Sequence, residues 1–112
     1  MADADRAPDA LTEAVRRKLR ITWKDDVTDA RIEQDIVPAA RATISERLGL
    51  PEGFDLGKPS PERMLVEALA FYLWNDAEDE FWPNYEREVV TLRRKWEVTS
   101  YAQAEKASSD LP

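Results

Sequence analysis

Carboxylates are the side chains with the clearest capacity for chemistry in this sequence, because its 112 residues include neither histidine nor cysteine. Zinc sites of the Cys/His type, disulfides, thiol nucleophiles and histidine general bases are therefore excluded. Two acidic clusters stand out: Asp25, Asp26 and Asp29 form one, and Asp76 with residues 78–80 forms the other. Such clusters can act as general acids and bases or bind a hard cation such as calcium.

Each acidic cluster also has a simpler structural interpretation. Residues 76–80 lack the spacing of an EF-hand loop, and acids at this place favour the start of a following helix. Nothing in the sequence gives Asp25 or Asp26 a cleft or a partner that would shift a pKa, so helix capping is the simpler account. With no glycine-rich phosphate loop either, we expect no catalytic residue, no metal site and no cofactor, and we predict that the protein is not an enzyme.

Two basic clusters lie at the predicted ends of helices. They consist of Arg16, Arg17, Lys18 and Arg20, and of Arg93, Arg94 and Lys95. Cations at this position complement the negative end of the helix dipole, which accounts for both clusters. Contacts with phosphates or with an acidic protein surface are the alternatives. The formal net charge of −7 weighs against DNA binding.

Four tryptophans are many for a small domain, and large aromatic residues are common both in cores and at association hot spots. Trp74 and Trp96 fall on apolar stripes, so we expect them in the core. Trp23 and Trp82 lie in or beside predicted loops and are the better candidates for a subunit interface.

The apolar pattern predicts an all-α fold, a small bundle of four main helices with a flexible C-terminal tail. The helices are predicted at residues 10–19, 29–48, 61–74 and 81–98. Asp9 is the expected N-cap of the first helix, and Ser60 that of the third. The third helix is apolar nearly all round, which predicts that it is the central or most enclosed one. We place Pro83 in the first turn of the fourth helix.

The second helix carries the strongest periodic signal, a stripe of apolar residues at steps of four. The stripe consists of Ile32, Ile36, Ala40, Ile44 and Leu48. Pro38 interrupts it and cannot donate a backbone hydrogen bond, so we expect a bend near Asp35. Gly49 follows the last stripe residue and suits a left-handed cap.

The chain is predicted to form one domain with two polar ends. Residues 1–8 form a polar arm, residues 9–98 the helical domain, and residues 99–112 a tail that is disordered until a partner orders it. The longest stretch without a charged residue, 68–75, is too short to span a membrane. We therefore expect a soluble protein that is made in the cytoplasm.

Short patterns of helix and turn connect this sequence to a known family. A short helix ends in Leu19-Arg20-Ile21, an acidic loop follows, and the next helix carries the segment 40–44 (ARATI). The second half adds the segment 72–77 (YLWNDA), then Phe81, Asn84-Tyr85 and Leu92-Arg93-Arg94. Over residues 11–98 the chain resembles the tailed-phage head-tail connector family, small all-helical head-completion adaptors.

The resemblance implies a structural role in the virion. Such adaptors form a ring of about twelve copies beneath the portal protein, extend the DNA channel, and present a platform to stopper or tail-completion proteins. DNA then passes through the channel without specific binding. No cofactor is implied, and the C-terminal segments of such proteins commonly engage the portal.

The family has no signature residues that can be transferred one by one, so the partner interface is inferred from position. We predict that it includes Trp23, Trp82, Arg93, Arg94, Lys95 and Tyr101. The alternative function is a small helical DNA-binding or regulatory module of phage or bacterial origin. It is disfavoured because the helix at 61–74 is nearly all apolar, whereas a recognition helix is basic.

Overall fold

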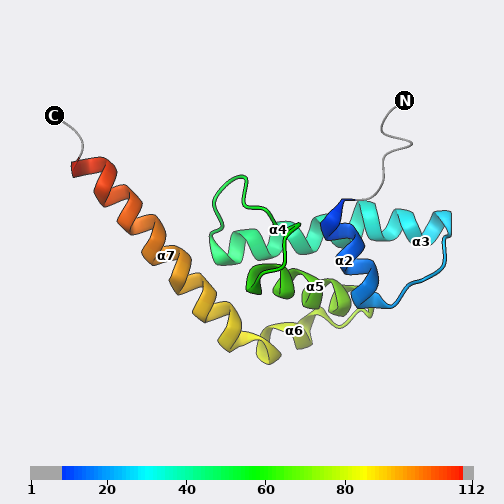
Figure 1. The fold of residues 1–112 in the computed structure, drawn as a ribbon. Coiled ribbons are helices and arrows are strands. Elements are labelled where there is room, and N and C mark those ends of the chain that lie inside the picture. The colour runs from blue at the N-terminus through cyan, green and yellow to red at the C-terminus, as the bar shows by residue number, and fades with distance from the viewer. Residues whose placement is uncertain (1–8, 110–112) are drawn as a thin grey trace.

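The computed structural model describes residues 9–109, and every regular element among them is a helix, which confirms the predicted all-α class. The predicted arm, residues 1–8, and the last three residues of the predicted tail lie outside this range. In chain order the elements are α2 (Ala10–Leu19), α3 (Asp26–Ala30), η1 (Arg31–Ile36), α4 (Val37–Leu48), α5 (Pro61–Trp74), α6 (Glu78–Asn84) and α7 (Glu86–Ser109) (Figure 1).

Helix α5 is the centre of the fold, as predicted. It lies against α2, α4, α6 and α7, while α3, η1 and α4 form one long helical run that passes beside it (Figure 1). The core lies where these elements meet, and Ile32, Ile44, Leu48, Leu69 and Phe81 are completely buried there. The packing of such apolar faces, rather than helix propensity, supplies most of the stability of a helical domain.

Helix boundaries predicted from capping residues are confirmed at three ends. The Asp9 carboxylate accepts a hydrogen bond from the Thr12 amide at 2.8 Å, and Ser60 Oγ accepts one from the Arg63 amide at 3.0 Å. Each side chain satisfies a backbone donor that the first turn leaves unpaired. Gly49 ends α4 with a φ of 70°, the left-handed conformation that glycine adopts at little cost.

The predicted bend near Asp35 is replaced by six residues of π-helix, η1. The Val37 amide donates to the carbonyl of Ile32, five residues earlier, so the turn before Pro38 is wider than an α-helical one. In a regular α-helix the ring of Pro38 would clash with the Gln34 carbonyl. The wider turn accommodates the proline, and the helical run continues without a break.

The π-helix also keeps the predicted stripe on one side of the run. In a regular α-helix, residues four apart drift by about 40° per step, so a stripe of five would turn by about 160°. A π turn holds more residues and offsets part of this drift. All five stripe residues are buried in the core: Ile32, Ile36, Ala40, Ile44 and Leu48.

The fourth predicted helix is in fact two helices, α6 and α7, which are separated at Tyr85. Pro83 lies near the end of α6, not in the first turn of a helix that begins at Phe81. It has no amide with which to bond the Asp79 carbonyl, and Tyr85 then leaves the helical conformation with φ −116° and ψ 16°. Residues 9–109 therefore form five helical segments rather than four main helices.

Helix α7 continues to Ser109, so the predicted helix end near Val98 was wrong. Most of the residues that were expected to form a flexible tail are helical. Extending an existing helix needs no new nucleus, and the Ala, Gln, Glu and Lys residues in this segment favour helix. Between Glu97 and Lys106 every residue except Thr99 is exposed, and this half of α7 projects away from the body (Figure 1).

Candidate partner-binding surfaces

The predicted interface residues do not converge on one site. Trp23 lies in the loop between α2 and α3, at one end of the molecule, whereas Tyr101 lies on the projecting half of α7 at the other end (Figure 1). Trp23 is 53% exposed and Tyr101 is 71% exposed. The molecule therefore offers separate surfaces, which suits a protein that contacts several neighbours.

A buried arginine orders the loop that carries Trp23. The Arg16 guanidinium is almost fully buried and donates to the Asp29 carboxylate at 2.6 Å and to the Trp23 carbonyl at 2.7 Å. Arg16 thus serves the fold rather than a phosphate, while Arg17 and Arg20 of the same basic cluster remain exposed. This role was not predicted from the sequence, because no local pattern shows which of the clustered cations faces inward.

Trp82 is half-buried and packs against its own chain. Its ring meets Phe81 edge-on, with centroids 4.8 Å apart, and the Arg47 guanidinium lies 4.3 Å above its centroid. Trp74, expected in the core, is likewise half-buried, and the Arg31 guanidinium covers its ring at 4.3 Å. These stacked cations shield the indoles from water, so Trp82 presents less surface to a partner than Trp23 does.

The buried carboxylate of Glu62, on α5, holds the first half of α7 against the body of the protein. Glu62 is 1% exposed, and its Oε2 accepts hydrogen bonds from Lys95 Nζ at 2.8 Å and from Trp96 Nε1 at 3.0 Å. Burial alone would raise the pKa of Glu62, but the bonds from Lys95, from its own backbone amide and from Trp96 outweigh burial and hold the pKa below its usual value. The Trp96 ring also meets Phe54 edge-on.

The basic cluster on α7 is therefore divided in function. Lys95, predicted as an interface residue, forms an ion pair with Glu62 inside its own chain. Arg93 forms an exposed ion pair with Glu97 one turn further on, at 3.1 Å, and Arg94 is exposed. Exposed pairs of this kind contribute little stability, so Arg93 and Arg94 are the members of this cluster that can bind a partner at low cost.

The central helix α5, although apolar nearly all round, leaves part of its outer face exposed. Met64 is 68% exposed and Phe71 42% exposed. Between α5 and the first half of α7 runs a groove of about 520 Å³, which we call the α5–α7 groove. Its lining comprises Lys18, Pro61, Met64, Leu65, Glu67, Ala68, Tyr85, Arg87, Glu88, Thr91 and Leu92. An adjoining hollow shares Lys18, Ala68 and Tyr85 and extends the surface to Phe71 and Arg20.

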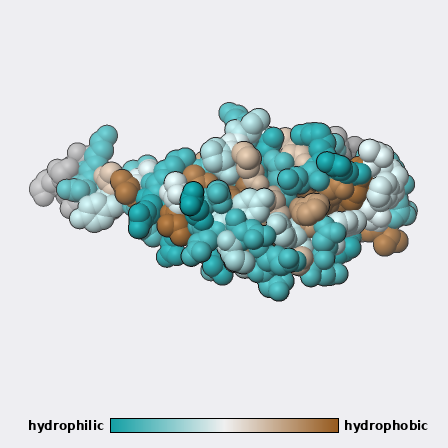
Figure 2. Space-filling model, turned by 90° about the horizontal axis from the view of Figure 1, so that it is seen from below, coloured by the Kyte–Doolittle hydropathy of each residue, from teal (hydrophilic) through white to brown (hydrophobic). Residues whose placement is uncertain are grey.

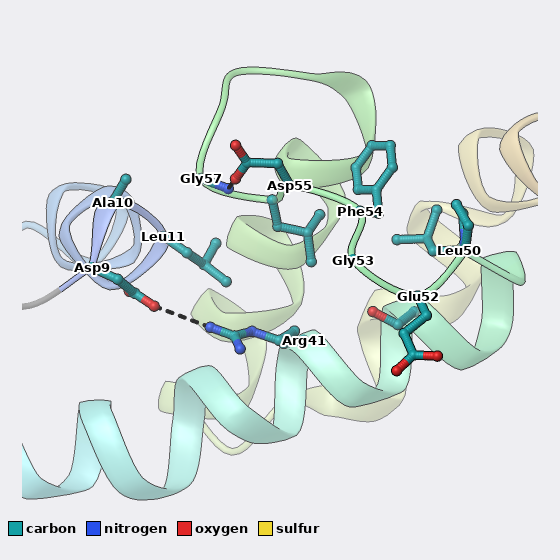
Figure 3. A pocket seen from close by; sticks show the side chains of 13 residues that line it. Asp9, Ala10, Leu11, Arg41, Leu50, Glu52, Gly53, Phe54, Asp55 and Gly57 are labelled. Carbon is teal, nitrogen blue, oxygen red and sulfur yellow. Dashed lines mark hydrogen bonds and ion pairs between the residues drawn. The ribbon is translucent and has the colours of Figure 1, made fainter.

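A second hollow, of about 510 Å³, lies between the start of α2, α4 and the loop at residues 50–57. On its floor the Asp9 carboxylate and the Arg41 guanidinium form an ion pair at 3.1 Å (Figure 3). Asp55 faces its own loop, where it accepts a hydrogen bond from the Gly57 amide at 2.8 Å. The Asp9–Arg41 pair thus joins the start of α2 to α4, and Asp55 orders the loop, so these polar groups of the hollow have structural roles.

Both acidic clusters have structural roles. The Asp25 carboxylate caps α3 by accepting hydrogen bonds from the Thr28 hydroxyl at 2.7 Å and amide at 3.0 Å, and these bonds lower its pKa. Residues 78–80 form the first turn of α6, where carboxylates favour the positive end of the helix dipole. Within residues 9–109, no three acidic side chains are grouped so that they could hold a metal ion.

No family model, curated protein or solved structure matches this chain. Among the helices that the structure describes, none is both long and apolar enough to cross a membrane.

Proposed function

We propose that this chain is a structural virion protein, a head-tail adaptor of a tailed phage. Copies would form a ring beneath the portal protein, extend the DNA channel, and join the capsid to stopper or tail-completion proteins. The work of such a protein is assembly, so it requires surfaces for partners and no reacting groups.

The projecting half of α7 is the observation that carries the proposal. A helix surrounded by water on all sides gains nothing from packing and is marginal by itself. This one nevertheless displays Val98 and Tyr101, which are 68% and 71% exposed. Figure 2 shows hydrophobic surface recurring along this helix toward its end. An exposed helix that carries two large apolar side chains next to the cations Arg93 and Arg94 is suited to bind a protein partner.

The acidic balance supports a role as a DNA conduit. With a formal net charge of −7, a ring of these chains carries a large negative charge. A negative channel wall repels phosphates, so a duplex slides past it instead of binding.

Portal binding tests the proposal. Purified protein is co-sedimented with portal rings of the same phage, and we expect about one copy per portal subunit, as a closed ring on a matching platform requires. A chain truncated after Val98 keeps all its buried core residues, so it should fold and yet fail to sediment with the portal. A truncated chain that still binds would contradict the role of α7.

Matched charge reversals locate the contact without shortening the chain. Arg94→Glu, on α7, should weaken portal binding, whereas Arg17→Glu, an equally exposed cation on α2, should leave it unchanged. Equal effects of the two substitutions would indicate general charge attraction rather than docking through α7.

A further inference from the structure

The loop between α2 and α3 and the first turn of α3 carry four exposed residues, Trp23, Asp25, Asp26 and Val27, which we call the Trp23 knob. Trp23 is 53% exposed and Val27 78% exposed, and hydrophobic surface is visible at this end of the molecule in Figure 2. Tryptophan is enriched among the residues that dominate binding energies at protein interfaces. Exposing it beside a valine costs free energy unless a partner covers them.

The knob is held in place before any partner arrives. Arg16 bonds the Trp23 carbonyl and Asp29, and Asp25 caps the helix that follows. These contacts hold the backbone and leave the Trp23 side chain exposed, so little backbone conformational entropy is lost when the indole is buried. The knob therefore has the properties of a preorganised anchor.

The α5–α7 groove complements this anchor in polarity. Its walls include the apolar side chains of Met64, Leu65 and Leu92, and its volume falls within the range of about 300–1,000 Å³ that is typical of sites which enclose a ligand. A tryptophan side chain is smaller than this volume, so the groove has room for the indole.

The groove also complements the anchor in charge. Its cations are Lys18 and Arg87, and its acids are Glu88 and Glu67. Glu67 is already paired with Arg63 at 3.0 Å, which leaves an excess of positive charge at the rim. The knob carries two carboxylates, at Asp25 and Asp26, against the single cation Lys24.

We infer that the Trp23 knob of one copy docks into the α5–α7 groove of the next copy. Knob and groove are different surfaces of the same chain, so the contact is heterologous and repeats around a ring. A second copy is the occupant because each copy supplies one knob and one groove of opposite charge. The inference rests on the proposed ring and specifies which surfaces close it, while α7 remains available for the portal.

Cross-linking of single-cysteine chains tests the contact, since the natural chain contains no cysteine to react. Chains with Val27→Cys and chains with Met64→Cys are mixed on portal rings, or free at high concentration, and treated with a short bifunctional maleimide. We expect a heterodimer that contains one chain of each kind. Val98→Cys replaces Val27→Cys in the control mixture, because Val98 is also an exposed valine but lies on the projecting half of α7.

The inference is overturned if the control mixture gives as much heterodimer as the test mixture, or if Met64→Cys chains mainly cross-link to each other. The second result would mean that the groove faces its own counterpart. Trp23→Ala should weaken the contact about thirtyfold in affinity, the change that loss of an interface hot spot produces, and the yield of the expected heterodimer should fall. Asp26→Lys should also lower the yield of this heterodimer, because it places a cation near Arg87. Arg87→Glu in the partner chain should restore the yield.

Portal binding distinguishes this inference from the proposed function. If chains bind portal rings at the expected ratio but Val27→Cys and Met64→Cys do not cross-link there, the knob contact is wrong and the adaptor role stands. If the two variants cross-link and no portal binding is seen, the chain self-associates by this contact but is not the proposed adaptor.

Discussion

The carboxylate of Glu62 fixes the position at which α7 leaves the body. It is buried, it bonds both Lys95 and Trp96, and these two neighbours lie one turn after the buried Leu92. A charge in such a place is stabilising only while its partners are present, because an unpaired buried charge is costly. The sequence indicated only a favourable acid at a helix start, since the partner is more than thirty residues away.

Replacing Glu62 with Gln should therefore destabilise the fold by about 1–3 kcal/mol, because the amide cannot pair with the Lys95 charge. The pH dependence has a definite sign. The pKa of Glu62 is lowered from 4.5, so its contribution is complete above that pH and is lost as the pH falls through the lower, native value. Urea unfolding of both proteins from pH 7 to pH 3 should show the difference in unfolding free energy shrinking below pH 4.5.

Glu97→Gln is the matched control for this experiment. Glu97 pairs with Arg93 on the surface of the same helix, and removing an exposed pair should cost less than about 0.5 kcal/mol at any pH. A difference between wild type and Glu62→Gln that persists unchanged at pH 3 would show that the charge of Glu62 is not what matters.

At the scale of elements, capping residues were the most informative part of the sequence. Asp9, Ser60 and Gly49 each marked a true helix end, because the capping interaction is local and needs no knowledge of the fold. The end of α7, by contrast, was not predicted correctly, because no local signal marks it. Apolar periodicity marks only the part of a helix that is buried, and residues 97–106 are almost entirely exposed.

The π-helix before Pro38 leads to a prediction about the proline itself. Removing a proline from the middle of a regular helix relieves a penalty of about 3 kcal/mol. Here η1 already accommodates the ring, so Pro38→Ala should raise the free energy of unfolding by less than about 1 kcal/mol. Chemical denaturation measures this change.

Ala42→Pro supplies the comparison, because Ala42 is exposed in the regular part of the same helical run. That substitution should cost about 3 kcal/mol. If Pro38→Ala stabilises the protein by as much as Ala42→Pro destabilises it, the π-helix does not relieve the strain of the proline.

At the scale of the whole molecule, the sequence predicted the fold class and the central position of α5, but it did not predict the groove. A helix that is apolar on every side does not reveal which side its neighbours leave uncovered; Met64 and Phe71 became visible as surface only once α2 and α7 were placed. The same holds for the basic clusters. Arg16 forms an ion pair with Asp29, and Lys95 forms one with Glu62. No local pattern in the sequence distinguishes these two cations from their exposed neighbours.

The internal pairing of some cations also weighs against the alternative function, a small DNA-binding or regulatory module. Arg16, Arg63 and Lys95 are paired with carboxylates and Arg31 covers Trp74, so these four cations are not available to neutralise phosphates on a chain whose net charge is already −7. The protein should not retard a labelled DNA duplex in a gel, even at about 50 mM salt, where electrostatic binding is strong. Retardation that weakens steeply as salt is raised would instead favour the DNA-binding module, because release of counterions from neutralised phosphates produces that dependence.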